Sequence, residues 1–109
     1  MDGMRLLRCI CDETRFSILQ TLGRGGEMPV GHIAAAINRE QPLVSHHLKI
    51  LKSCGILSHR VDGRRILYRI SSIEMTMLIS DILSTSERIS NLCACAETEC
   101  CAPDMAVGN

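Results

Sequence analysis

The chain has 109 residues with twelve basic and twelve acidic side chains, so its formal net charge is zero. This length allows one small domain, and a hydrophobic content of 46% is enough for a core, which excludes wholesale disorder. One Phe and one Tyr are too few for a module that stacks single-stranded bases on aromatic rings, and no apolar run is long enough to span a membrane.

The N-terminal quarter predicts two short helices. Residues 4–11 form the first, and Asp12 is a suitable N-cap for the second, which the glycine-rich residues 23–26 end. The apolar stripes comprise Leu6, Leu7 and Ile10 in the first helix and Phe16, Leu19 and Leu22 in the second. Charged residues are scattered from the start, which is unlike a signal peptide, so we expect a cytoplasmic protein without a membrane partner.

The middle of the chain predicts a helix, a tight polar break and a second helix. The helices cover residues 30–37 and 41–53, and Pro42 belongs in the first turn of the second. Val44, Leu48 and Leu51 recur at i, i+4 and i+7, which predicts that they form the buried face. The polar side chains of the second helix can then lie outside this buried face.

A β-hairpin and a long helix follow. Two strands, residues 57–61 and 65–70, flank a turn at Asp62-Gly63, and Ser71 with Glu74 forms a capping box for a helix over residues 72–92. The apolar band of that helix is too wide for a small domain to cover, which predicts a second copy of the chain against it. The band comprises Met75, Leu78, Ile79, Ile82 and Ile89, with Ile73, Met77 and Leu83 beside it.

These elements predict a mainly α fold with a β-hairpin wing (α+β), a homodimeric winged helix-turn-helix. Residues 1–92 would form the DNA-binding and dimerisation domain, and residues 93–109 a Cys-rich tail without a core of its own.

The charge is distributed unevenly. Residues 39–69 carry seven basic and two acidic side chains, whereas residues 70–109 carry one basic and six acidic. A polyanion such as double-stranded DNA is therefore attracted to the middle of the chain. The candidate DNA-binding residues are Arg39, Gln41, Ser45, His46, Lys49, Arg64 and Arg65. Gln41 can pair with adenine, the cations can neutralise phosphates or enter the minor groove, and we expect His47 to pack locally.

Several segments resemble the ArsR/SmtB family of winged-helix repressors. They are Cys11-Asp12-Glu13-Thr14-Arg15, residues 27–34, residues 41–51, Cys54-Gly55-Ile56-Leu57 and the wing at 62–68. The resemblance covers residues 4–90 and implies a homodimer that binds a palindromic operator and releases it when a metal or metalloid binds. Two family sensor sites are missing. Pro29 and Gly31 stand where arsenic and lead sensors have a Cys-x-Cys pair, and residues 73–92 contain no His for the zinc site.

Seven cysteines suggest another sensor site. Thiolates prefer As(III), Sb(III), Cd(II), Pb(II) or Zn(II) over hard cations. The first-choice ligands are Cys93, Cys95, Cys100 and Cys101, and the second choice is Cys9, Cys11 and Cys54. Some arsenic-responsive family members have similar cysteines just past the last helix. Of Cys9 and Cys11, which point to different helix faces, we expect one to pack in the core.

We therefore expect a transcriptional repressor released by a soft metal(loid), As(III) or Sb(III) first. One alternative keeps the fold but makes the repressor a thiol redox or persulfide sensor. A second alternative, from a different functional class, is a cytosolic metal-carrying or thiol-transfer protein. The chain shows no phosphate-binding loop and no nucleophile elbow, so we expect neither an enzyme nor a small organic substrate.

Overall fold

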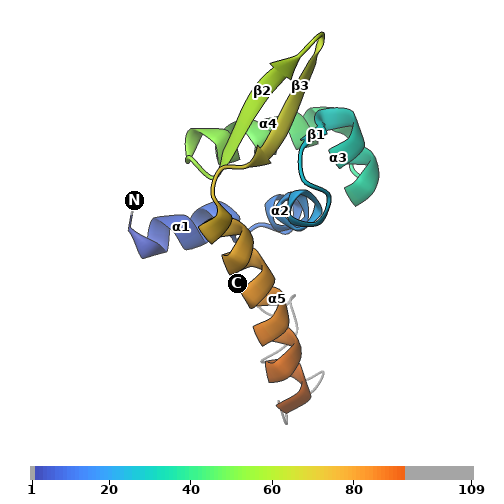
Figure 1. Cartoon of the computed structure of the whole chain (residues 1–109). Coiled ribbons are helices and arrows are strands. Elements are labelled where there is room, and N and C mark those ends of the chain that lie inside the picture. The colour runs from blue at the N-terminus through green and yellow to red at the C-terminus, as the bar shows by residue number, and fades with distance from the viewer. Residues whose placement is uncertain (1, 93–109) are drawn as a thin grey trace.

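The computed structural model describes residues 2–92, and Figure 1 shows their elements. In chain order these are α1 (Gly3–Ile10), α2 (Glu13–Gly25), β1 (Met28–Pro29), α3 (Val30–Ile37), α4 (Gln41–Ser53), β2 (Leu57–Asp62), β3 (Arg65–Ile70) and α5 (Ile73–Leu92). The predicted helices, the hairpin and the winged helix-turn-helix arrangement are confirmed. The tail, residues 93–109, lies outside the described residues.

The first two helices begin at aspartate caps. The carboxylate of Asp2 accepts a hydrogen bond from the backbone N–H of Arg5 at 2.8 Å, and that of Asp12 accepts one from Arg15 at 3.1 Å. The predicted Asp12 cap is therefore confirmed. At its other end, α2 stops at Gly26, which has a φ of 77°, a left-handed conformation that favours glycine. The N–H of Gly26 donates to the carbonyl of Leu22.

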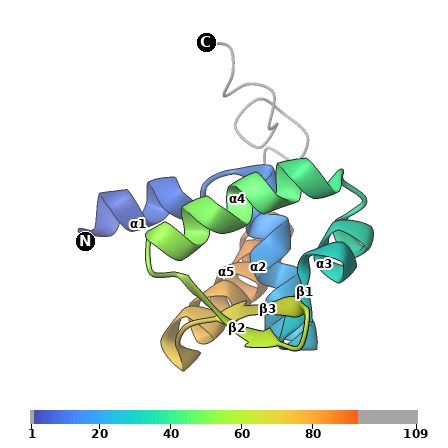
Figure 2. The same ribbon diagram turned by 90° about the horizontal axis from the view of Figure 1, so that it is seen from above.

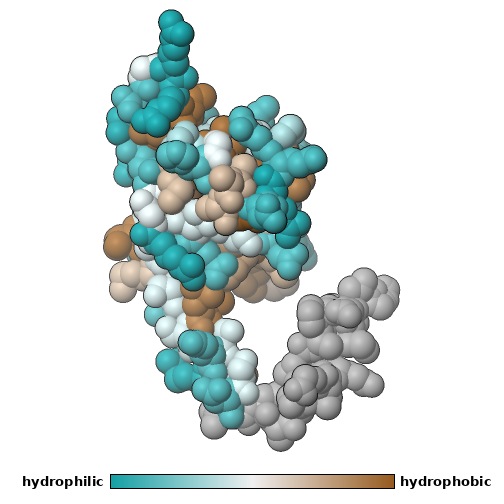
Figure 3. Space-filling view, turned by 90° about the vertical axis from the view of Figure 1, so that its right-hand side faces the viewer, coloured by the Kyte–Doolittle hydropathy of each residue, from teal (hydrophilic) through white to brown (hydrophobic). Residues whose placement is uncertain are grey.

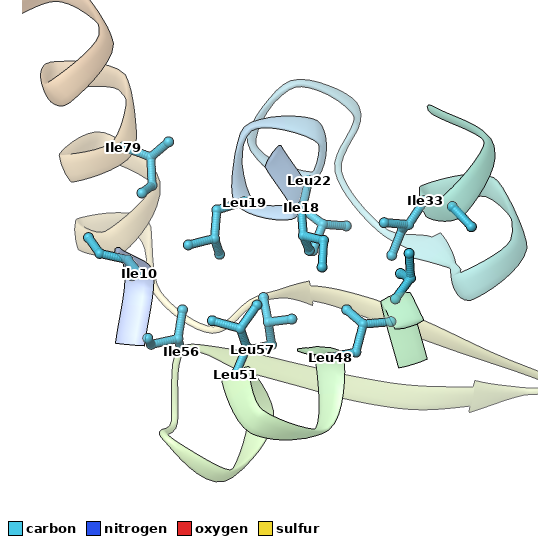
Figure 4. Packing of buried hydrophobic residues seen from close by; sticks show 12 residues of the cluster. Ile10, Ile18, Leu19, Leu22, Ile33, Leu48, Leu51, Ile56, Leu57 and Ile79 are labelled. Atoms are coloured by element: carbon cyan, nitrogen blue, oxygen red, sulfur yellow. The ribbon is translucent and has the colours of Figure 1, made fainter. Parts of the chain in front are cut away.

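The core lies between α2, α3, α4 and the base of the hairpin (Figure 4). Val44, Leu48 and Leu51 are fully buried, as their spacing predicts. Ile18, Leu19 and Leu22 form the buried face of α2, and Phe16 lies half-buried at its edge. The predicted stripe of α1 is wrong at Leu7, which is 53% exposed because the core touches α1 mainly at its last residue, Ile10.

The sheet has the antiparallel order β1-β3-β2. The short strand β1, which was not predicted from the sequence, pairs Met28 with Tyr68 and Pro29 with Leu67. A proline is tolerated there because β1 is an edge strand. The predicted turn is shifted by one residue: Asp62 pairs with Arg65, so the turn residues are Gly63 and Arg64. Gly63 has a φ of 67°, and a glycine with positive φ at the first turn position fits a type II′ hairpin.

The start of α5 corrects the predicted capping box. The backbone N–H of Met75 donates to Ser72 Oγ at 3.1 Å, so Ser72 is the cap instead of Ser71. The hydroxyl of Ser71 instead donates to the carbonyls of Gly55 and Ile56 at 2.6 and 2.9 Å. Ser71 therefore ties the end of the hairpin to the turn between α4 and β2.

Helix α5 leaves the body of the domain and is covered on one side near its start (Figures 1 and 2). Ile79 is 2% exposed, and Met75, Ile82 and Leu83 pack against the core. The rest of the predicted apolar band is exposed, together with two residues of α1. We call these exposed apolar side chains the uncovered α1/α5 residues, and they are Met4, Leu7, Ile73, Met77, Leu78 and Ile89. Within residues 2–92, no helix is long and apolar enough to cross a membrane.

Truncating the buried face of α4 should destabilise the fold. Leu51→Ala removes a side chain with no exposed surface and should lower the free energy of unfolding by about 2–5 kcal/mol. Val61→Ala, at a residue that is 67% exposed, should change it by less than about 0.5 kcal/mol. Urea unfolding at a fixed protein concentration measures both, and equal effects would contradict the assigned core.

Candidate nucleic-acid interface

The turn between α3 and α4 sets the direction of the second helix. Asn38 adopts a left-handed conformation with a φ of 57°, and its N–H donates to the carbonyl of Ala35 at 3.3 Å. The N-cap of α4, Glu40, makes no side-chain capping bond, so the first backbone N–H groups of α4 have no side-chain acceptor there. This end of α4 is therefore open to a phosphate or a base edge.

The buried stripe of α4 leaves a polar face outward. Gln41, His46 and Lys49 are exposed, and Ser45 is half-buried. A Cβ added to Gly31 would lie 3.7 Å from Gln41 Oε1, so the amide of Gln41 lies beside α3. We call Gln41, Ser45, His46 and Lys49 the reading face.

The wing, β2 and β3, extends beyond the body, and its tip is hydrophilic in Figure 3. Arg64 lies in the exposed turn, and Arg65 Nη2 lies 3.5 Å from Asp62 Oδ2. The structure thus presents cations at the wing tip and on the reading face, as proteins that grip duplex DNA require.

Some of the basic residues are engaged within the chain. Arg39 Nη2 lies 3.3 Å from Glu13 Oε1, which ties the loop before α4 to the start of α2. Arg60 donates two hydrogen bonds to the carboxylate of Glu27, at 2.7 and 2.8 Å. Among residues 2–92, neither Lys49 nor Arg64 makes an ion pair, so both are available to phosphates. Arg39 and Arg65 would have to exchange a carboxylate for a phosphate.

A side-chain contact that the sequence did not predict joins α2 to α4, the reading helix. Arg15 Nε donates to His47 Nδ1 at 3.2 Å, and Arg15 Nη1 donates to the carbonyl of Cys9 at 3.1 Å. The side chain of His47 is only 12% exposed, so its predicted local packing is confirmed. The only signal for this contact in the sequence was the resemblance of Cys11-Asp12-Glu13-Thr14-Arg15 to the family. That resemblance does not indicate that Arg15 contacts His47, which lies 32 residues further along the chain.

Two of the three cysteines outside the tail meet. Cys9 Sγ and Cys54 Sγ lie 2.8 Å apart, and both residues are half-buried against the core, whereas Cys11 is exposed. The neighbouring Cys9 thiol raises the pKa of Cys54 above its ordinary value, and burial raises it further. One of Cys9 and Cys11 was expected in the core, and it is Cys9. In the described part of the chain, no three His, Cys, Asp or Glu residues form a group that could hold a metal ion. The first-choice ligands Cys93, Cys95, Cys100 and Cys101 lie outside that part.

Comparison with known proteins agrees with this geometry. A family model described as "Bacterial regulatory protein, arsR family" matches residues 12–59. The transcriptional repressor SdpR of Bacillus subtilis is 39% identical over 67 residues, which cover 62% of this chain and 73% of SdpR. The arsenical resistance operon repressor of Escherichia coli is 35% identical over 68 residues, and these cover 62% of this chain but only 58% of that repressor.

A solved structure extends the likeness to the whole fold. The homodimeric winged helix-turn-helix DNA-binding domain of Mb0332 from Mycobacterium bovis superposes with a TM-score of 0.76 at 26% identity, covering 84% of this chain and 83% of that one. The fold and the reading face define a winged helix-turn-helix protein. The chain belongs to the arsR family of bacterial regulatory proteins. That family consists of transcriptional regulators, so the expectation that the chain is no enzyme is confirmed.

The ion pair of Glu27 with Arg60 predicts a pH-dependent contribution to stability. Hydrogen bonds from Arg60 lower the pKa of Glu27 below its ordinary value of 4.5. Because this pKa is lower in the folded state, the stabilisation is present above about pH 4.5 and is lost as the pH falls through the folded-state pKa. Arg60→Gln should therefore lower the thermal midpoint at pH 7 and lower it less at pH 3.5. Arg64→Gln, at the exposed turn, is the control, and a pH-independent effect of Arg60→Gln would contradict the assignment.

Proposed function

We propose that this protein is a transcriptional repressor that binds an inverted-repeat DNA operator as a homodimer and is released by a thiophilic metal(loid), with As(III) or Sb(III) first. The observation that carries the DNA-binding proposal is the exposed reading face of α4 beside a wing with cations at its tip. Gln41 would read a base edge, with Ser45 and His46 nearby, and the basic side chains would hold phosphates.

The uncovered α1/α5 residues support the homodimer. Met4 and Leu7 on α1 and Ile73, Met77 and Ile89 on α5 are each more than half exposed. Two copies paired through these exposed apolar side chains would carry two reading helices, and an inverted repeat would present one half-site to each. The Mycobacterium bovis domain of the same fold is homodimeric.

The cysteines support a thiophilic effector. As(III) and Sb(III) bind thiolates far more readily than oxygen ligands. We propose that tail thiolates hold the ion, with Cys95 and Cys101 joined by Cys93 or Cys100. The E. coli relative is named as the repressor of an arsenical resistance operon, which favours arsenic among the candidate ions, while Cd(II), Pb(II) and Zn(II) follow. Family membership favours a regulator over a metal-carrying or thiol-transfer protein.

Binding of the ion would act on the dimer through α5, because the tail continues from that helix. A change in how α5 packs against the second copy would alter the spacing of the two reading helices. Allosteric couplings are typically about 1–3 kcal/mol, and a switch from 1:99 to 99:1 requires about 5.5 kcal/mol of differential binding.

The salt dependence of operator binding tests the reading face. Each lost phosphate contact should reduce the slope of log K against log salt by about 0.9. Lys49→Gln and Arg64→Gln should each give such a reduction. Arg88→Gln is the matched control, because Arg88 lies in the last turns of α5. Figure 1 shows that this end of α5 lies away from α4 and the wing. Fluorescence anisotropy with the promoter duplex at several salt concentrations measures the slope, and unchanged slopes in both reading-face variants would contradict the proposed interface.

The response to As(III) tests the proposed effector and its ligands. Saturating As(III) should weaken operator binding about 10-fold or more. Cys93→Ser with Cys95→Ser should leave metal-free affinity intact and abolish the response, whereas Cys11→Ser should retain it. Unchanged affinity of the wild-type protein in As(III) would refute the effector. A response that survives loss of the tail cysteines but not loss of Cys9 and Cys54 would refute the ligand set.

A further inference from the structure

The half-buried thiols of Cys9 and Cys54 have no role in the proposed DNA interface. The two residues are 45 positions apart in the sequence, yet their sulfur atoms lie 2.8 Å from each other. A disulfide bond is about 2.05 Å long, so the sulfurs would have to approach by less than about 1 Å to form one.

Backbone hydrogen bonds and core packing fix the positions of both cysteines. Cys9 lies in the last turn of α1, and its carbonyl accepts a hydrogen bond from Arg15 Nη1 at 3.1 Å. Cys54 is the C-cap of α4, and its N–H donates to the carbonyl of Ile50 at 3.0 Å. Both side chains pack against core residues. The pair is therefore positioned by the fold itself.

The third cysteine of this region does not join the pair. Cys11 is exposed, and within residues 2–92 its sulfur makes no hydrogen bond to either of the other two and forms no three-residue metal-binding group with them. The arrangement offers two sulfurs to one another instead of three sulfurs to a pyramidal ion. The Cys9–Cys54 pair is therefore suited to a reaction between two thiols. It is not suited to three-coordinate binding of a metalloid, which is the role proposed for the tail cysteines.

We propose that Cys9 and Cys54 are a redox-active dithiol that closes to an intramolecular disulfide by exchange with a small-molecule disulfide. The thiolate of Cys9 attacks one sulfur of the small disulfide, whose S–S bond breaks and expels the first small thiolate. The thiolate of Cys54 then attacks the sulfur of Cys9, forms the Cys9–Cys54 bond and expels the second. The two protons of the cysteine thiols end on the two expelled thiols, so the protein is oxidised and the small disulfide is reduced.

Contact between the sulfurs favours the internal bond over a lasting mixed disulfide. Cys54 is already beside the sulfur that it attacks, so the second step is intramolecular and has a high effective concentration. The product would link the last turn of α1 to the end of the reading helix α4. Because α1 carries the exposed residues Met4 and Leu7, the bond would fix the position of these two residues relative to the reading helix.

Mass spectrometry of the full-length chain tests this inference independently of DNA and metal binding. In a variant with Cys11, Cys93, Cys95, Cys100 and Cys101 changed to Ser, incubation with oxidised glutathione should remove both free thiols. Proteolysis should then yield linked peptides containing Cys9 and Cys54, and dithiothreitol should separate them. The thermal midpoint should rise on the order of 10 °C upon oxidation.

The matched control carries Cys54→Ala in the same background. It should keep a glutathione adduct on Cys9 or stay reduced, and its thermal midpoint should not rise. The wild-type chain should give the same Cys9–Cys54 peptide link, which provides a second measurement if the multiple variant folds poorly. Stable glutathione adducts on both cysteines, links between two copies of the chain, or free thiols at the highest oxidant concentration would overturn the inference.

Discussion

The orientation of α4 depends on its buried stripe. Val44, Leu48 and Leu51 have no exposed surface and pack among α2, α3 and the base of the hairpin. A helix with one face so fixed must present its opposite side to solvent, and here that side carries the reading face. Hydrophobic packing of a few aliphatic side chains thus determines where the polar chemistry lies.

Polar contacts refine this packing. Ser71 ties the hairpin exit to the turn after α4, the Arg60–Glu27 pair links the wing to the residue before β1, and Arg15 links α2 to His47. Each contact joins the wing or the reading helix to another part of the domain. They keep the wing and the reading face in one arrangement, which a binder of a rigid duplex needs for pre-organisation.

Local patterns predicted most of the fold. The spacing of Leu48 and Leu51, the Asp12 cap and the two-strand pattern around Gly63 depend on near neighbours in the sequence, and each element formed. The predicted capping box was wrong because two adjacent residues compete for the same role. Ser71 and Ser72 can both cap a helix, and only the carbonyls of Gly55 and Ile56, distant in sequence, decide that Ser71 is used elsewhere. Strand β1 was missed because two residues are too few to show a periodic pattern.

For the candidate site, the sequence predicts which residue types lie on a face of the helix. The Cys9–Cys54 contact and the partner of Arg15 follow from tertiary packing alone.

The proposed function has two separable parts, a DNA reader in the described domain and a thiol-based response. The most direct test of the first, on which the second depends, is NMR chemical-shift mapping of the protein with its promoter duplex. The largest changes should fall on the amides of Gln41, His46 and Lys49 and on the turn at Gly63 and Arg64. Changes confined to α1 and α5, or none at saturating duplex, would contradict the assignment of α4 and the wing as the DNA-binding surface.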